Sequence, residues 1–319
     1  MREDEFKLIL DREKHKKDSQ QIFSRQINLL TDLVNYGSNL IPRSYDSSSK
    51  KLEDIIVIGV LLKQVVSMID AIEILVSNGA VQAAHLEARS AFEASLYIDW
   101  ILEGESEKKA RYYYVYNLRN QKLWALRFTT GTHEKEYFSQ VISDLGKHLN
   151  LDNPNIEAQA KKELSEINRV LEQDSFSEVN KIFENERNKK TGLEAYWYKP
   201  LGITSIRKLA EKVGRLYEYD IFYSMSAEIS HATSYKDHLR FDRDRIVFEP
   251  IRQLKGLYEL LKFVITVALA SYVSILKHYR AGEISNFIRK YQSDWREAFL
   301  NIPSVSYIYP DTQSNNGSA

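Results

Sequence analysis

Apolar residues recur at intervals of three and four along most of the chain, which is the spacing that places side chains on one face of an α-helix. At the start of the chain they are Phe6, Ile9, Phe23, Ile27, Leu30, Leu33 and Val34. This pattern predicts a long amphipathic helix over residues 2–38. A loop is expected over 39–50, where Pro42 precedes a run of serines, and a second helix over 52–77.

The helical pattern continues to the end of the chain with few interruptions. Further helices are expected over 80–103, 105–128, 134–149, 155–173, 175–188, 204–213, 217–239, 251–279 and 283–300. A loop is predicted over 189–203 and a short extended piece over 245–248. The predicted fold is therefore all-α with little or no β-structure. We expect an N-terminal helix and loop (1–50), a single helical bundle (51–300) with a helical insertion at about 134–190, and a disordered tail (301–319).

Composition supports the helical prediction and limits the partners. The 319 residues include Gly 12, Pro 6 and Cys 0, so few positions break a helix. Lys+Arg 44 against Asp+Glu 44 gives a net charge of +0, which argues against a uniformly basic nucleic-acid binder. The charged first residues and the lack of cysteine indicate a cytoplasmic protein. The two most apolar stretches, 55–76 and 257–276, contain charged residues and are predicted to be core helices, not membrane spans.

The helix predicted over 80–103 is rich in alanine and serine, and it carries a stripe of polar residues. His85, Arg89 and Glu93 follow each other at i, i+4 and i+8, so they lie on one face, and Arg89 is within ion-pair reach of Glu93. A charged pair on an apolar helix costs free energy unless the two groups pair or bind a ligand. An internal salt bridge and a functional pocket both remain open.

A second group of polar residues lies on the helix predicted over 217–239. Tyr223, Ser226 and Ser230 project along one side, with Tyr219 before them and His231 beside them. The His231 imidazole is the one side chain of this group that titrates near neutral pH, as a general acid or base must. It is either a catalytic group or a core histidine that hydrogen-bonds a serine or tyrosine.

These two groups carry a resemblance to a known family. The matching elements are Ala88–Glu93, Trp197, Tyr219, Tyr223 and Ser226-x3-Ser230-His231. Over roughly 52–276 the chain resembles the bacterial helical proteins called domain of unknown function 5677. The resemblance implies a helical core in which these polar residues converge, and it implies no particular reaction. It is also distantly similar in style to the helical nucleases of bacterial defence and toxin systems.

Charge is unevenly distributed along the chain. Residues 187–215 hold eight basic side chains against Glu194 and Glu211, a net charge of +6. Because Tyr196, Trp197 and Tyr198 lie among them, the segment is a candidate site for RNA or another anionic ligand, with phosphate contacts such as Lys199 and stacked bases. The alternative is a solvated basic face with Trp197 in the core.

Other motifs are weak. Glu228-x-x-His231 has the spacing of one half of a di-iron site, but the sequence has no second copy. Arg127-x5-His133 matches the arginine–histidine spacing of the helical nucleases, yet one such match is expected by chance and it spans a non-helical stretch. We expect no metal and no cofactor.

Two functions follow as hypotheses, and the sequence does not decide whether the protein is an enzyme. The first is a metal-independent ribonuclease-like effector of a defence or toxin system. Its catalytic residues would be Arg89, Glu93, Tyr223, Ser230 and His231, and its substrate-binding residues Tyr219, Ser226, Trp197 and Lys199. The second is a non-enzymatic helical module that binds a small ligand or partner protein, with Arg89, Glu93 and His231 as a structural polar network. The tyrosines at 112–116 are a candidate homodimer interface.

Overall fold

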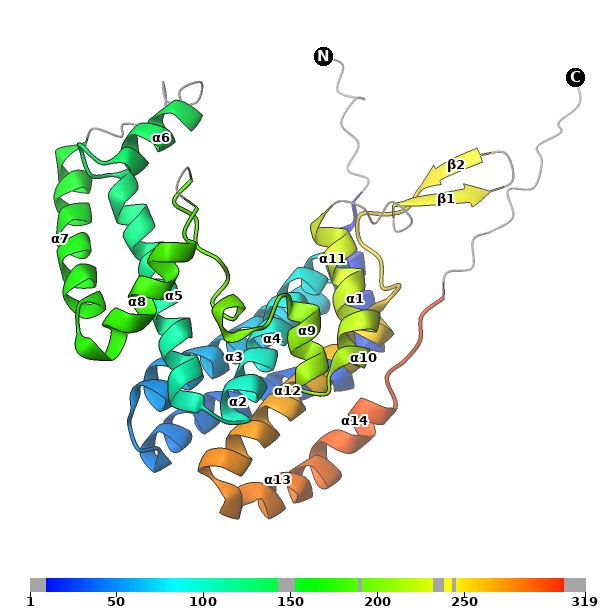
Figure 1. Ribbon diagram of the computed structural model, residues 1–319. Helices are drawn as coiled ribbons and strands as arrows, with labels where there is room; N and C mark the ends of the chain where they lie inside the picture. Colours follow the sequence, from blue (N-terminus) through cyan, green and yellow to red (C-terminus); the bar gives the residue numbers. More distant parts are fainter. Residues whose placement is uncertain (1–9, 143–152, 189–190, 232–237, 243–244, 307–319) are drawn as a thin grey trace, which may run out of the picture. The chain divides into compact units, whose positions relative to one another are not determined.

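The computed structural model describes residues 10–142, 153–188, 191–231, 238–242 and 245–306 (Figure 1). The predicted all-α class is confirmed: helices account for most of these residues, and the sheet among them has two strands. The chain divides into two compact units. Unit 1 comprises 1–47, 61–99 and 215–319, and unit 2 comprises 48–60 and 100–214. The predicted insertion at 134–190 lies inside unit 2, which extends beyond it on both sides.

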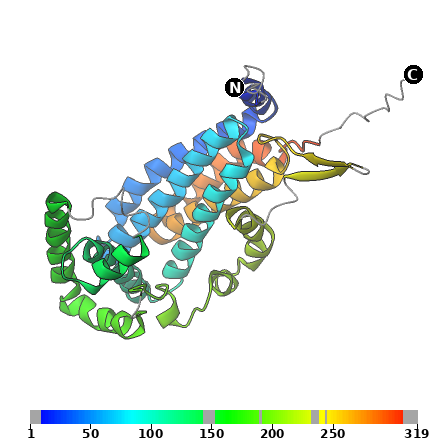
Figure 2. The same cartoon turned by 90° about the horizontal axis from the view of Figure 1, so that it is seen from above.

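Unit 1 is a bundle of long helices to which several shorter helices are added. Figure 2 shows its blue, cyan and orange helices running side by side. Its elements are α1 (Arg12–Ile22), α2 (Ser24–Ser47), most of α3 (Gly59–Ser77) and of α4 (Val81–Leu102), α10 (Leu216–Glu218), the π-helical turn η5 (Tyr219–Tyr223), α11 (Ser224–Ser230), strands β1 (Leu239–Asp242) and β2 (Arg245–Phe248), α12 (Leu257–Tyr279), η7 (Ala281–Glu283), α13 (Ile284–Lys290), η8 (Tyr291–Trp295) and α14 (Arg296–Leu300).

Helix α12 is the core helix of unit 1. Apolar residues occur all around it, as in helices that are covered on every side. It is long and apolar enough to span a membrane by composition, but 61% of its most apolar window is buried inside the fold. This burial agrees with the prediction of a core helix.

Small residues allow the helices of unit 1 to approach α12 closely. The Ser271 hydroxyl of α12 donates to Ser95 Oγ of α4 over 2.8 Å, a bond that short side chains make only when two helices nearly touch. On α2, the Tyr272 hydroxyl of α12 donates to the Leu33 carbonyl over 2.8 Å. Gly37 lies one turn further along, where it has no side chain to obstruct the tyrosine.

Three predicted boundaries in unit 1 are wrong. The loop expected from 39 is helical to Ser47, because Leu40 and Ser44 are buried and hold the last turns of α2 in place despite Pro42. The helix expected over 217–239 ends at Ser230, and Leu239 begins β1 instead. The extended piece at 245–248 is confirmed as β2, which pairs antiparallel with β1. Helix α12 begins at Leu257, six residues after the predicted start.

Unit 2 is built around α5 (Ser106–Arg127). Its other elements are η2 (Glu53–Ile58), α6 (His133–Val141), α7 (Pro154–Leu171), α8 (Asp174–Glu186), η4 (Lys199–Leu201) and α9 (Ile206–Lys212). The tyrosines of α5 pack within the unit: the ring centroid of Tyr112 lies 5.9 Å from that of Phe183, and Tyr114 lies 5.4 Å from Phe176. Part of the helix predicted over 134–149 lies outside the described residues.

Replacing Gly37 with alanine tests the close packing of α2 and α12. An added Cβ meets Val66 Cγ2 at 2.5 Å and overlaps the hydroxyl of Tyr272, which is fully buried and cannot move aside. We expect Gly37→Ala to lower the free energy of unfolding by about 1–3 kcal/mol, although alanine is the better helix former. Chemical denaturation measures it. In the control Gly59→Ala, the nearest atom lies 3.6 Å away, so stability should not fall. Equal stability of Gly37→Ala and wild type contradicts the prediction.

Candidate functional site

A line of polar contacts joins α4 to the α10–η5–α11 stretch of unit 1. The two segments run antiparallel, because Asp99 near one end of α4 contacts Arg215, Glu93 contacts Tyr223, and His85 near the other end contacts Ser226. We call this line the polar seam. Its members are His85, Arg89, Glu93, Ser95, Asp99, Arg215, Tyr219, Tyr223, Ser226 and Ser230.

Arg89 is the centre of the seam. Its Nε lies 3.2 Å from Glu93 Oε1, and its Nη1 donates to Ser230 Oγ over 2.7 Å. The guanidinium carbon lies 4.7 Å from the centroid of the Tyr223 ring, within the range of a cation–π interaction. Arg89 also makes a side-chain hydrogen bond with the Tyr223 hydroxyl. A guanidinium has five N–H hydrogens, so its bonds to Glu93, Ser230 and Tyr223 leave two of them for an anion.

The phenol of Tyr223 completes this arrangement. Its hydroxyl donates to Glu93 Oε1 over 2.6 Å. Burial and the neighbouring Glu93 carboxylate raise the pKa of Tyr223 far above its ordinary value. Burial lowers the pKa of Arg89, but Tyr223 and Glu93 together outweigh it and raise the pKa. Arg89 is thus a permanent cation, and Tyr223 stays protonated and donates its hydrogen to Glu93.

The π-helical turn η5 positions the two tyrosines. The rings of Tyr219 and Tyr223 stack with centroids 4.7 Å apart and planes 23° apart. The Tyr223 ring also contacts Phe92 of α4, with ring centroids 5.9 Å apart. Such turns are rare and occur often at functional sites. The sequence pattern predicted an ordinary helix here and did not reveal this turn.

The other end of the seam is enclosed, and sequence reasoning missed it. Arg215 Nη1 donates to Ser95 Oγ over 2.5 Å and lies 2.9 Å from Asp99 Oδ2, while Ser274 of α12 donates to Asp99 Oδ1 over 2.6 Å. The side chains of Arg215 and Asp99 are 10% and 16% exposed, against 26% and 30% for Arg89 and Glu93. Solvent and solutes therefore reach the Arg89 end more easily. The sequence signal that could have indicated this end is the spacing of four between Ser95 and Asp99, which places both polar side chains on one face of α4.

The two remaining predicted residues of unit 1, Ser226 and His231, differ in exposure: Ser226 is buried and His231 is exposed. Ser226 is fully buried and lies 3.5 Å from His85 Nδ1, so it serves the interior of the seam. His231 follows α11 directly and is exposed beside Ser230. No hydrogen bond or ion pair joins its ring to Arg89 or Glu93 within the described part of the chain.

Trp197 and Lys199 belong to unit 2. Trp197 is 2% exposed and packs against Trp100, with centroids 5.1 Å apart, and against Tyr113. It is therefore a core residue, which is the alternative that the sequence left open. Lys199 is exposed, and its ammonium lies 6.0 Å from the Tyr196 ring.

Pairing reduces the free charge of the basic segment 187–215. Arg187 pairs with Glu134, Lys208 with Glu211, and Arg215 with Asp99. Lys189 and Lys190 lie outside the described residues. The net charge of +6 thus overstates what the segment offers to an anion.

The weaker motifs are not assembled into sites. Arg127 ends α5 and His133 begins α6, so they do not share a helix. In the described part of the chain, no group of three or more His, Cys, Asp or Glu residues is placed to hold a metal ion.

Comparison with known proteins places the seam within a family. A model of a family of unknown function, DUF5677, matches residues 54–246. The chain belongs to this family. The DUF5677 match includes α4, η5 and α11, and hence every member of the seam. The match ends before α12, so it is shorter than the resemblance predicted over 52–276. No curated protein and no solved structure matches the sequence.

Replacing Tyr223 with phenylalanine tests the hydrogen bond to Glu93. We expect Tyr223→Phe to lower the free energy of unfolding by about 1–2 kcal/mol, because the bond is partly buried and its acceptor is charged. The raised pKa of Tyr223 means that this contribution is complete below pH 10 and declines as pH rises above it. Urea denaturation at several pH values measures both effects. Tyr219→Phe is the control, since the Tyr219 hydroxyl bonds no described residue. Equal losses in the two variants contradict the prediction.

Proposed function

We propose that the Arg89 end of the polar seam binds an RNA phosphodiester and cleaves it without a metal ion. The observation that carries the proposal is the state of Arg89. Glu93, Ser230 and Tyr223 fix its guanidinium, yet the side chain is 26% exposed and these three partners use only three of its five N–H hydrogens. A fixed cation with accessible donors suits an oxygen of a phosphate.

The neighbouring residues supply the other requirements of the reaction. His231, exposed directly after Ser230, accepts the proton of a ribose 2′-hydroxyl, and the 2′-oxygen attacks phosphorus. The 5′-oxygen leaves and takes a proton from water, which gives a cyclic phosphate and a 5′-hydroxyl, and the hydroxide formed takes back the proton held by His231. Arg89 stabilises the negative charge that develops on the phosphate oxygens. Glu93 and Tyr223 position Arg89, and Ser230 orients its Nη1.

The distant similarity in style to the helical nucleases of bacterial defence and toxin systems supports an effector role. The substrate is a polyanion, so part of its affinity is expected to come from phosphate contacts with exposed cations and to fall as the salt concentration rises. We propose that the protein acts as an RNA-cleaving effector in a bacterial defence or toxin system, where cleavage of cellular RNA stops growth.

A non-enzymatic module is the second candidate function. It is favoured by the enclosed Arg215 end, where Arg215 bonds Ser95, Asp99 and Glu218 as in a structural network, and Ser274 in turn bonds Asp99. In this case Arg89 only extends the network, and the protein binds a small ligand or partner protein.

The decisive test replaces His231. We expect His231→Ala to slow cleavage of a labelled single-stranded RNA by about 10²–10⁴-fold, because the general base is removed. The exposed ring makes few contacts, so the melting temperature should stay the same. The assay contains EDTA and follows cleavage on a denaturing gel.

Two variants serve as controls. His278→Ala removes an exposed histidine at the end of α12 and should cleave at the wild-type rate. Arg89→Lys keeps a positive charge but loses the planar fork, and it should cleave much more slowly than wild type. A wild-type protein that cleaves no RNA, or an active His231→Ala variant, overturns the nuclease proposal and favours the module.

The basic segment generates a separate prediction about RNA binding. Replacing Lys189, Lys190, Lys208 and Lys212 with glutamine removes four cations that are candidates for neutralising phosphates. We expect a plot of log affinity against log salt concentration to become less steep, by roughly 0.7 for each phosphate of a single-stranded RNA that is no longer neutralised. Fluorescence anisotropy at several salt concentrations measures the slope. An unchanged slope assigns the segment to a solvated surface.

A further inference from the structure

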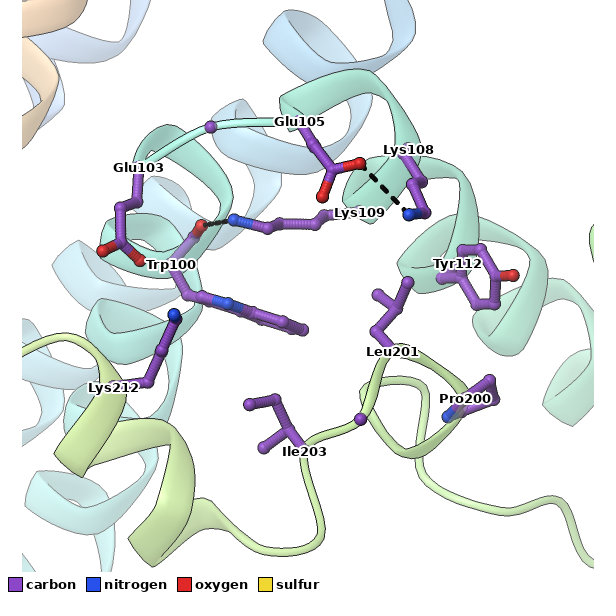
Figure 3. Close-up of a pocket in the computed structure, with 12 residues that line it drawn as sticks. Trp100, Glu103, Glu105, Lys108, Lys109, Tyr112, Pro200, Leu201, Ile203 and Lys212 are labelled. Atoms are coloured by element: carbon purple, nitrogen blue, oxygen red, sulfur yellow. Dashed lines mark hydrogen bonds and ion pairs between the residues drawn. The ribbon is translucent and has the colours of Figure 1, made fainter.

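Unit 2 contains a cavity that is separate from the polar seam. Its volume is about 780 Å³, within the range of roughly 300–1,000 Å³ that is typical of small-molecule sites. Figure 3 shows that the end of α4, the start of α5 and the loop around η4 surround it. Its floor is formed by the buried residues Trp100, Lys109 and Tyr112, and Leu201 and Ile203 form an apolar wall.

Lys109 places a positive charge at this floor. The residue is 8% exposed, and its Nζ donates to the Trp100 carbonyl over 2.5 Å and lies 5.0 Å from the centre of the Trp100 ring. No carboxylate among the described residues lies within ion-pair distance of Nζ. A buried charge without a counter-ion is unfavourable, so such charges are normally paired.

The two carboxylates that line the cavity are directed to other partners or to solvent. Glu105 pairs with Lys108 over 3.1 Å, and both side chains are more than half exposed. Glu103 is exposed at the rim, near Lys212 in Figure 3. Burial accordingly lowers the pKa of Lys109, although Glu103 and Glu105 act in the opposite direction. An anion in the cavity would supply the missing counter-ion.

We propose that this cavity binds a small organic monoanion with a flat apolar body, of the aromatic carboxylate class. The ligand's carboxylate pairs with the Lys109 ammonium, and its ring packs between Trp100 and the wall of Leu201 and Ile203.

The charges of the lining fit a single negative charge. Three lysines (108, 109 and 212) and two glutamates (103 and 105) leave one net positive charge. The glutamates at the rim repel polyphosphates, which carry more charge than the lysines balance. The Trp100 ring is itself held by Trp197 at 5.1 Å, so the aromatic wall is rigid before a ligand enters.

The experiment uses 1-anilinonaphthalene-8-sulfonate, an aromatic monoanion whose fluorescence increases in apolar surroundings. The full chain is titrated with this probe, and bound probe is displaced with 2-naphthoate or with its neutral analogue 2-naphthamide. We expect saturable binding, with naphthoate displacing the probe at concentrations at least about tenfold lower than naphthamide, because a buried ammonium distinguishes a charged from a neutral group by that much or more.

Two lysine variants form a matched pair. Lys109→Met should weaken probe binding by at least about tenfold and abolish the preference for naphthoate. Lys108→Met removes the neighbouring exposed lysine and should change the affinity by less than about twofold. Circular dichroism checks that both variants fold.

A third variant keeps the charge and fills the space. Ile203→Trp should weaken the binding of both naphthoate and naphthamide while Lys109 stays intact. If Lys109→Met does not fold, this variant tests whether the ligand binds in the cavity. Equal displacement by naphthoate and naphthamide, wild-type affinity in a folded Lys109→Met, or unchanged binding in Ile203→Trp would each overturn the proposal.

Discussion

The close packing of α4 against α12 is the constraint on which unit 1 depends. Ala84, Ala88 and Ala91 are fully buried on α4, and the hydrogen bond between Ser95 and Ser271 fixes how near the two helices come. A larger side chain at these positions would force the helices apart. Once α4 is held this way, its adjoining polar face has a fixed direction, and the α10–η5–α11 stretch must supply partners for its charges.

The two arginines of the seam show how this requirement is met in different ways. Each guanidinium lies over an aromatic ring, Arg215 over Phe92 at 4.9 Å and Arg89 over Tyr223 at 4.7 Å. Arg215 is enclosed by serine and aspartate side chains of α4, and this fits a role in holding helices together. Arg89 has similar partners but greater exposure, so its remaining donors face a medium from which a ligand can arrive. The same chemistry thus serves structure at one end and is available for function at the other.

Much of this arrangement could be predicted from local sequence patterns, and the rest depends on contacts between distant residues. The spacing of four between Arg89 and Glu93 predicted their pairing, which the structure shows at 3.2 Å. The partner of Asp99 could not be found in this way, because Arg215 lies 116 residues further along the chain. The helix predicted over 217–239 missed both the π-helical turn and the strand at its end, since helical periodicity does not distinguish a π-turn and short strands follow tertiary pairing. The position of Trp197 could not be predicted from the sequence. Its basic neighbours are typical of an exposed tryptophan that stacks on bases, whereas its packing on Trp100 depends on the fold of unit 2.

Helix α5 carries two buried cations, Lys109 and Arg119, and Arg119 shows how this fold pairs a buried cation that has a structural role. Arg119 is bound by Glu194 at 2.8 Å and Glu184 at 2.7 Å, and the side chains of Arg119 and Glu194 are each 2% exposed. The fold therefore supplies carboxylates where a buried cation has a structural role. Lys109, nearly three helical turns earlier, has a carbonyl and an aromatic ring beside it, but no carboxylate of the described residues within ion-pair distance. Both cations are buried on the same helix, so burial alone does not explain why only Arg119 has carboxylate partners. Lys109 faces a cavity with room for an external anion, whereas Arg119 faces packed side chains.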